Sequence, residues 1–513
     1  MQRHPRRMMP ARLTLRSAGR MLARGTGRPA TSTARAMILP LALAQFIASY
    51  AATNMNVAIS AIARELNTTV AGVQTAITLF TLVMAALMIP GSKLTDIWGR
   101  KTCFVAGLII YGIGGLLALA SQGIALLTIG YSLFEGVGSA LMIPPIYILI
   151  TVLFPDVKSR AKYFGAVSGA GGLGAAAGPL IGGLVTSAIS WRASFGLQVL
   201  VVAWIVLLAR KISDPARQGP VPTFDLVGAI LSAAGLFFVV LGLLQSRTYG
   251  FGQSRQNLTI NGTVVIGKGS ISPVWILVAI GALFLLWFFL HVRARELKHK
   301  DVLLPLRLFG NKVSNLGLGT QVIQWLTVQG SFFSVSVFLQ KVDGYDAIKT
   351  GLVLTPATIG ILATSAAADR FARRRSQRSL IMAGFGITIV GMILVLILVR
   401  AHSAIVTWIP GLLLLGAGVG IMLTSSVNVV QSSFPDSDQG DISGLSRSVS
   451  NLGSSLGTAL VGSVLVAKPA GMPFAAAFTM MLVFTLIGLL LAVLIPREPA
   501  PIASPAERSP TGA

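Results

Sequence analysis

Long apolar stretches organise the sequence, and fourteen of them follow one another between residues 37 and 495. Each holds about 20 residues, the length of helix that crosses ~30 Å of hydrocarbon. Only 11% of the 513 residues are charged, whereas soluble domains average roughly 25%. The sequence therefore predicts an all-α polytopic membrane protein. The predicted spans lie near 37–58, 72–91, 103–121, 125–154, 163–188, 193–209, 226–244, 273–291, 313–340, 350–368, 379–399, 404–427, 442–467 and 473–495.

Basic residues orient these spans. A net charge of +25 would suggest nucleic-acid binding in a soluble protein, but here the basic residues lie in loops between apolar runs. With the N-terminus inside, cytoplasmic loops and tails hold 31 of the 41 Lys and Arg residues, outside loops hold nine, and Arg447 lies within a span. By the positive-inside rule, we expect a plasma-membrane protein with no nucleic-acid partner. Both termini and the loops around Lys101, Arg210, Lys298 and Arg374 should be cytoplasmic.

The first 36 residues form a basic tail with nine arginines and no acidic residue. This tail resembles a transit peptide as much as a cytoplasmic tail. A start codon placed too early is a third interpretation, because Met37 directly precedes the first span. We assign the tail no function.

The residues that usually build metal or redox sites are scarce. Cys103 is the single cysteine, which excludes an internal disulfide framework and a cysteine-cluster metal site. The four histidines are scattered, and no two lie at ligand spacing within one helix. The spans contain no nucleophile with a base, metal cluster or cofactor motif. We therefore expect no metal, no cofactor and no enzymatic activity.

A glycine run lies in the fifth predicted span. Gly174, Gly178 and Gly182 recur at every fourth residue, so in a helix they form one stripe without side chains. Such a stripe lets a second helix approach backbone to backbone, which is how helices associate in lipid. Pro179 removes one backbone donor and bends the helix, and Gly183 completes the run. Small-residue packing alone is the simpler interpretation of this pattern.

A short charged loop follows the second predicted span. Asp96 is its one carboxylate and is surrounded by cations, among them Arg100 and Lys101. Gly99 allows a sharp turn, and Asp96 can cap or pair across the gap, which would make the loop a conformational latch. The alternative is an ordinary positively charged cytoplasmic loop.

These motifs resemble those of the major facilitator superfamily. The run 174–183 resembles the antiporter motif in the fifth span of its drug:proton antiporters, and the loop 91–101 resembles motif A of the whole superfamily. Segments 338–356 and 440–457 are similar to the ninth-to-tenth span connection and the penultimate span. Segment 369–375 resembles a degenerate repeat of motif A. The resemblance covers about residues 37 to 495, and it is to the fourteen-span antiporters.

The sequence departs from that family in several places. Ser92 stands where motif A opens with glycine. In the first span, Ala51 replaces the membrane aspartate implicated in proton handling, and Ser60 replaces a proline. In the fourth span, Ser132 replaces the motif B arginine and Glu135 its glutamine. Glu135 is the one acidic residue deep in a span, about 15 Å from the outer surface at 1.5 Å per residue. We expect it to carry the coupling proton, although a structural hydrogen bond is the alternative.

The resemblance implies two six-helix bundles related by pseudo-symmetry, with spans 7 and 8 as a peripheral insertion and the substrate site at the midplane. The implied division is a basic tail 1–36, a first bundle 37–210, two extra spans 211–312 with an outside loop 245–272, a second bundle 313–495 and a C-terminal tail 496–513.

Polar residues in the spans are candidates for the substrate cavity. Each amide is equally explained by a hydrogen bond between helices. Arg447 lies about two turns inside the cytoplasmic end, where it can also snorkel to the interface or pair with Asp441. The cavity candidates are Asn54, Asn56, Gln74, Gln324, Gln329, Arg447 and Asn451.

The resemblance implies a function, namely proton-coupled export of hydrophobic or amphiphilic small molecules by a monomer. The substrate class comes from the resemblance and not from a particular residue. A facilitator, or a transporter dedicated to one metabolite, is the alternative that the missing aspartate and arginine favour. A membrane-embedded enzyme or a sensor lacks support, because no catalytic motif and no soluble domain is present.

Overall fold

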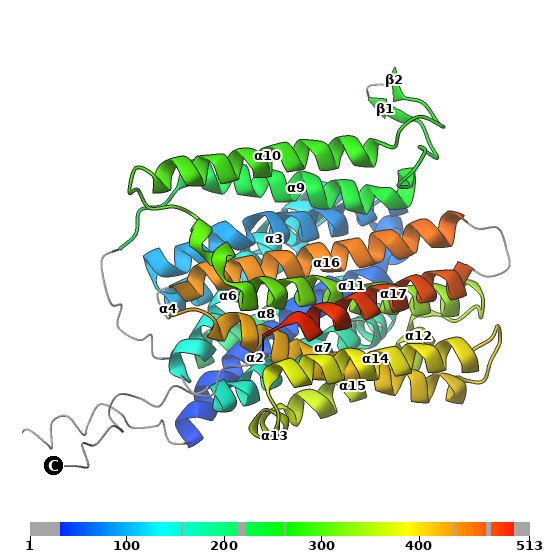
Figure 1. Cartoon of the computed structure of the whole chain (residues 1–513). Helices are drawn as coiled ribbons and strands as arrows, with labels where there is room; N and C mark the ends of the chain where they lie inside the picture. The colour runs from blue at the N-terminus through cyan, green and yellow to red at the C-terminus, as the bar shows by residue number, and fades with distance from the viewer. Residues whose placement is uncertain are drawn as a thin grey trace, which may run out of the picture.

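The computed structural model describes residues 31–154, 157–212, 221–260, 263–435, 438–467 and 473–496. Most of both predicted tails lies outside these residues. The all-α prediction is confirmed, since the described residues form fourteen long helical segments and one small β-hairpin (Figure 1). Thirteen segments are long and apolar enough to cross a membrane. The fourteenth coincides with the predicted span 442–467, and it contains Asp441, Arg447 and several serines.

Six of these segments precede the predicted insertion, and we call them the first helix group. They run antiparallel to one another, so successive connections alternate between the two ends of the bundle (Figure 1). The fourth segment combines a short α-helix, a π-helix and a longer α-helix. The bounds are α2 (Thr31–Glu65), α3 (Val70–Trp98), α4 (Arg100–Leu119), α5 (Ile124–Leu127), η1 (Thr128–Glu135), α6 (Gly136–Leu153), α7 (Val157–Ala188) and α8 (Trp191–Ala209).

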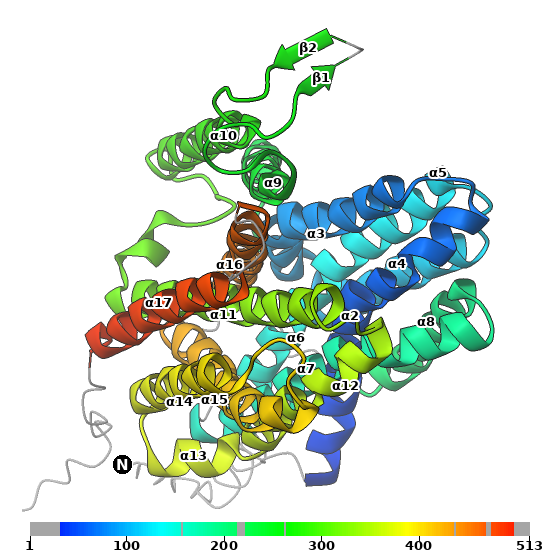
Figure 2. The ribbon, with the colours of Figure 1, turned by 90° about the vertical axis from the view of Figure 1, so that its right-hand side faces the viewer.

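Two helices and a hairpin follow. Helices α9 (Leu226–Tyr249) and α10 (Pro273–Glu296) pack on each other, and strands β1 (Leu258–Ile260) and β2 (Thr263–Ile266) pair antiparallel between them. The hairpin occupies part of the predicted outside loop. This unit lies at the edge of the molecule, where α9 contacts α3 (Figures 1 and 2).

The remaining six long segments form what we call the second helix group. In Figure 2 its helices α13, α14, α15 and α17 lie on the side away from α4 and α8, whereas α16 lies beside α3. A short 3-10 helix, η2 (Leu306–Gly310), leads into it. The bounds are α11 (Lys312–Lys341), α12 (Ala347–Ala366), α13 (Ala368–Arg374), α14 (Gln377–Leu398), η3 (Ile405–Trp408), α15 (Ile409–Ser432), α16 (Gln439–Ala467) and α17 (Pro473–Leu494).

Each group has its own apolar core. One large cluster of buried side chains runs from Ile38 to Ile212 with a single outside member, Val427. A second runs from Leu326 to Ile495. Smaller clusters join the groups, and one of them places Leu303 of the α10–α11 connection beside Ile89 of α3 and Ile442 of α16. The assignment of residues 37–210 and 313–495 to two bundles that move as units stays a prediction.

The glycine stripe of α7 lies against α2. A side-chain carbon at Gly174 would overlap the Phe46 carbonyl oxygen, and one at Gly178 would overlap the Thr53 hydroxyl and lie 2.9 Å from the Asn54 amide nitrogen. The same atom at Gly182 would lie 3.2 Å from the Asn54 Cβ. The stripe therefore lets two helices of the same group touch backbone to backbone. The side chain of Pro179 lies outside what the structure describes.

Other glycines of α7 face the second helix group. An added carbon at Gly165 would overlap the Ser365 carbonyl oxygen of α12, and one at Gly172 would lie 2.9 Å from Ile361. Near the opposite end of α7, Gly183 faces Ile348 at 3.4 Å. Helix α7 thus uses different glycines to approach helices on two sides.

We predict that Gly178→Ala lowers thermal stability. The added carbon forces α2 and α7 apart, and overpacking of this kind typically costs about 1–3 kcal/mol, which outweighs the ~1 kcal/mol that alanine gains in helix propensity. Gly386→Ala in α14 is the matched control, because nothing lies within 4 Å of a carbon added there. Thermal unfolding in detergent measures both variants. Equal stability of the two would contradict close packing at Gly178.

Candidate functional site

Helix α3 ends in a tight turn that belongs to the predicted latch. Gly99 has φ +97°, a backbone conformation that side chains disfavour, and it ends α3 while Arg100 begins α4. Lys101 reaches the last turn of α8, where its Nζ donates to the Arg210 carbonyl oxygen at 3.1 Å. We call the end of the molecule that carries this turn the basic end.

The last turns of α3 bind the start of α16. Lys93 Nζ lies 2.9 Å and 3.2 Å from the two carboxylate oxygens of Asp441, and both side chains are buried. At the preceding residue of α16, the Ser92 hydroxyl donates to the Gly440 carbonyl oxygen. A carbon added at Gly440 would overlap the Asp96 carboxylate. These contacts join the two helix groups at the basic end, and we call them the α3–α16 latch.

Sequence reasoning identified only part of this latch. It selected Asp96, Gly99, Arg100 and Lys101, but it missed Lys93 and treated Ser92 only as a departure from the motif. The unused signal is the four-residue spacing of Gly440 and Gly444, since a carbon at Gly444 would lie 2.6 Å from the Ser92 Cβ. Arg100 makes no ion pair with a described residue.

Asp441 lies in the first turn of α16, outside the predicted span 442–467. Burial raises the pKa of its carboxyl to about 7, the Lys93 ammonium opposes this rise, and the nearby Asp96 charge adds to it. The Asp441 carboxylate of the latch therefore takes up a proton as the pH falls through about 7.

Glu135 ends the π-helix η1, and its side chain is completely buried. π-Helical turns inside α-helical segments are frequent at functional sites. A carbon added at Gly115 of α4 would lie 3.6 Å from Glu135 Oε1. Neither carboxylate oxygen has a partner within hydrogen-bonding geometry among the described residues. Glu135 thus points into the interior of the first helix group.

Buried polar groups lie near Glu135. The Tyr111 hydroxyl on α4 is within electrostatic reach of the carboxyl, and it donates to Gln198 Oε1 on α8 at 2.7 Å. Gln198 Nε2 has no partner among the described residues. The sequence does not predict a role for Tyr111 and Gln198. They lie in different apolar runs, and nothing in the sequence indicates that the two runs pack against each other.

The predicted cavity amides fall in different environments. Asn54 donates from Nδ2 to the Ser194 hydroxyl of α8 at 3.1 Å, and Gln324 of α11 accepts from the Ser426 hydroxyl of α15 at 2.8 Å. Both are hydrogen bonds between helices, as the alternative interpretation expected. Gln74 is exposed near the start of α3, and Gln329 is half-buried.

Two further cavity candidates remain. Asn451 is half-buried, and its Nδ2 has no partner among the described residues. The side chain of Asn56 lies outside what the structure describes. None of the described candidates lines the pocket between α7 and the second helix group.

Arg447 crosses from the second helix group to the first. Its side chain is buried, its guanidinium carbon lies 4.1 Å from the centre of the Tyr147 ring on α6, and Nη1 donates to the Tyr147 hydroxyl at 3.2 Å. Neither of the two predicted alternatives describes this position. Asp441 is bound to Lys93 instead, and Arg447 does not extend into solvent.

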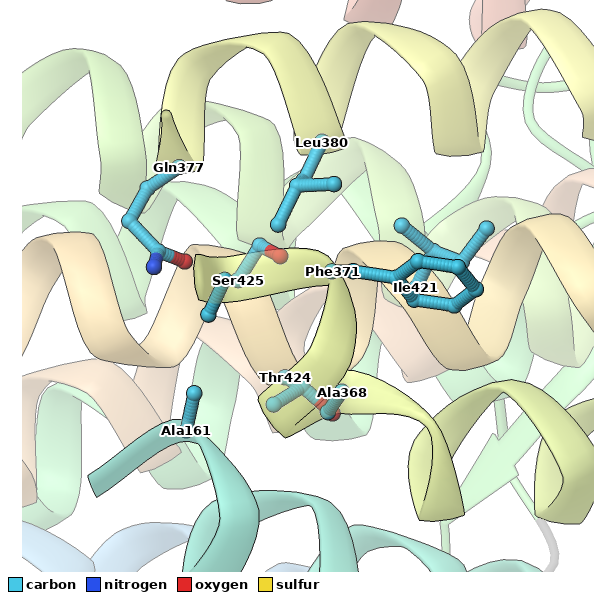
Figure 3. Close-up of a pocket in the computed structure, with 9 residues that line it drawn as sticks. Ala161, Ala368, Phe371, Gln377, Leu380, Ile421, Thr424 and Ser425 are labelled. Atoms are coloured by element: carbon cyan, nitrogen blue, oxygen red, sulfur yellow. The ribbon is translucent and has the colours of Figure 1, made fainter. Parts of the chain in front are cut away.

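A small pocket lies between α7 and the second helix group. Ala161 of α7 faces Phe371, Leu380 and Ile421, and Gln377, Thr424 and Ser425 supply the polar atoms (Figure 3). Its empty volume of about 200 Å³ includes space that is open to solvent, so the enclosed part is far smaller than the roughly 300–1,000 Å³ of typical ligand sites. The pocket is therefore too small for a drug-sized molecule in this conformation. Among the described residues, no cluster of three metal-ligating side chains occurs.

We predict that Asp441→Asn removes a pH dependence of stability. A carboxyl whose pKa is raised in the folded state binds its proton more tightly there than in the unfolded chain. The free energy of unfolding should therefore fall as the pH rises from about 4 to about 7, by up to ~1.4 kcal/mol per pH unit. Thermal unfolding across this range should show the decline in the unmodified protein and not in Asp441→Asn.

Arg307→Gln is the control for that experiment. Arg307 pairs with Asp438 at the same end, but its side chain is 68% exposed, and exposed pairs contribute little. An equally steep decline in Asp441→Asn and in the unmodified protein would show that another group causes it.

Solved structures of known transporters share this fold. The human organic anion transporter MFSD10 (TETRAN) superposes with a TM-score of 0.60 at 10% sequence identity, covering 89% of this chain and 99% of the transporter. The proton:xylose symporter XylE gives 0.59 at 12% identity, covering 91% and 96%. These similarities concern the fold alone.

Sequence comparison identifies relatives and a family. The cephamycin export protein CmcT of Amycolatopsis lactamdurans is 26% identical over 93% of this chain and 95% of its own length. The probable actinorhodin transporter of Streptomyces coelicolor is 28% identical over 80% of this chain and 69% of its own. Residues 41–271 and 258–458 match the family model of the Major Facilitator Superfamily. Because these matches cover most of a chain that has the corresponding fold, the chain belongs to the major facilitator superfamily.

Proposed function

We propose that this protein exports hydrophobic or amphiphilic small molecules across the plasma membrane, driven by the proton gradient. The relatives named above are a cephamycin export protein and a probable actinorhodin transporter, and a multidrug resistance protein of Mycobacterium tuberculosis is 26% identical over 80% of this chain and 72% of its own length. These names support transport rather than catalysis, and they support efflux as its direction.

In this proposal the two helix groups act as bundles around a central substrate site. Residues 37–210 and 313–495 rock against each other, spans 7 and 8 stay peripheral, and both termini are cytoplasmic. The α3–α16 latch supports this mechanism, because it joins the groups through Lys93 and Asp441 and must break before the basic end can open. The transporter works as a monomer surrounded by membrane lipid.

The burial of Glu135 is the observation that supports proton coupling. It is a completely buried acid within a predicted span, and the Tyr111 hydroxyl is the polar group that interacts with it. A permanent charge there is expensive, and ionisable residues inside membranes are usually functional. A group that must be neutral when enclosed and can ionise when water enters has the property required of a proton carrier.

Ala51 and Ser132 keep the alternative function open. The resemblance expects an aspartate and an arginine at these positions, and neither is present. A facilitator or a transporter of one dedicated metabolite would not need them. In that case substrate would move down its own gradient, and an imposed proton gradient would not raise its accumulation.

Transport into inside-out vesicles tests the proposal. We predict that Glu135→Gln loses proton-driven accumulation of a fluorescent amphiphile and falls to the level seen without a gradient, while exchange of that amphiphile is retained. Glutamine keeps the size of the side chain and mimics its protonated form. Glu65→Gln is the matched control. Glu65 lies exposed at the end of the molecule opposite the basic end, where it pairs with Arg192. Undiminished, equally pH-dependent accumulation by Glu135→Gln would exclude Glu135 as the proton carrier.

A further inference from the structure

Arg447 is a buried cation without an anionic partner. Its side chain is only 8% exposed, and no carboxylate of the described residues forms an ion pair with it. Its guanidinium contacts the ring and the hydroxyl of Tyr147. An unpaired buried charge costs several kcal/mol, and a tyrosine offsets only part of that cost.

The two acidic residues that would be expected to pair with Arg447 have other neighbours. Asp441 lies six residues before Arg447 on α16, about 9 Å along the helix, and its carboxylate is bound by Lys93. Glu135 faces α4 within the first helix group. Two other buried cations are held differently: Lys93 pairs with the Asp441 carboxylate, and Arg160 donates to the Phe154 carbonyl oxygen and the Ser432 hydroxyl.

The surroundings of Arg447 have the character of a recognition site. The Tyr147 hydroxyl donates to Gln45 Oε1 of α2 at 3.2 Å, and the Tyr147 ring stacks with Phe164 of α7 at 6.0 Å between centroids. Helices α2, α6, α7 and α16 therefore meet at this point, which lies between the two helix groups. Apolar and aromatic walls with a few polar groups are typical of small-molecule sites.

We propose that Arg447 and Tyr147 form the anion-recognition part of the substrate site, and that the transported molecules carry a carboxylate or a similar oxyanion on an apolar aromatic body. This inference rests on the proposed export function and specifies its substrate class. A guanidinium binds an oxyanion through two parallel hydrogen bonds. The substrate would thus supply the anionic partner that Arg447 lacks, and its aromatic body would face Tyr147 and Phe164.

Two dyes that differ by one charged group provide the test. Anilinonaphthalene sulfonate and neutral N-phenyl-1-naphthylamine share the same aromatic body, and only the first carries an oxyanion. Proton-driven uptake of each is measured in inside-out vesicles. We expect the unmodified protein to move the sulfonate faster. Arg447→Gln should slow the sulfonate about tenfold or more, the effect of losing ~1.4 kcal/mol or more, and leave the neutral dye within about twofold.

Two further variants separate recognition from structure. Arg447→Lys keeps the charge without the planar fork and should fall between the unmodified protein and Arg447→Gln. Tyr147→Phe keeps the ring and frees the guanidinium of its hydrogen bond, so the preference for the sulfonate should persist. If Arg447→Gln does not fold, the selectivity of these two variants decides the question.

Each contrary outcome has a distinct meaning. Equal slowing of both dyes by Arg447→Gln would make Arg447 a structural tie between helix groups and overturn the proposal. Proton-driven uptake of the neutral dye without preference for the sulfonate would overturn it while the export function stands. If neither dye accumulates with a proton gradient, the export function fails, and this inference fails with it.

Discussion

Close backbone contact between helices is the constraint on which the rest of the structure depends. Lipid removes the hydrophobic force that would press apolar helices together, so packing and hydrogen bonds must hold them. Glycines provide the contact at several crossings. A carbon added at Gly91 of α3 would lie 2.5 Å from the Ala140 carbonyl oxygen of α6, and one at Gly457 of α16 would overlap the Leu326 carbonyl oxygen of α11. Helix α3 thereby packs against α6, and α16 packs against α11.

The polar contacts between the groups follow from that closeness. Lys93 reaches Asp441 because Gly440 and Gly444 bring α16 against α3. Because α16 lies this close, Arg447, which follows Asp441 by six residues on α16, lies over the Tyr147 ring. Glu135, in contrast, is enclosed by α4 and its neighbours within one group. The buried cation and the buried acid therefore occupy separate places, one at the boundary between groups and one inside the first.

The sequence predicts helices well and helix rotation poorly. Apolar runs of spanning length located the long segments, and the spacing of Gly174, Gly178 and Gly182 indicated a bare face. Neither pattern says which helix covers that face, because partners such as Lys93 and Asp441 are separated by 348 residues. For the same reason the sequence, which predicts Arg447 as a cavity residue and offers Asp441 as an alternative partner, does not indicate its contact with Tyr147. The predicted position of Gln74 within its span depends on where α3 begins, and the apolar pattern fixes that residue less well than it fixes the presence of the helix. Gln74 lies exposed near the start of α3.

The spacing along α7 and α12 shows which end of the molecule is shut. At the basic end, a carbon added at Gly165 would overlap the Ser365 carbonyl oxygen. Further along α7, the nearest atoms of α12 are side-chain atoms, at 3.5 Å from Gly169, 2.9 Å from Gly172 and 3.4 Å from Gly183. The two helices thus approach most closely at the end where the α3–α16 latch also lies. Two independent crossings therefore close the same end. Opening that end requires both crossings to separate, the α3–α16 latch and the contact of α7 with α12.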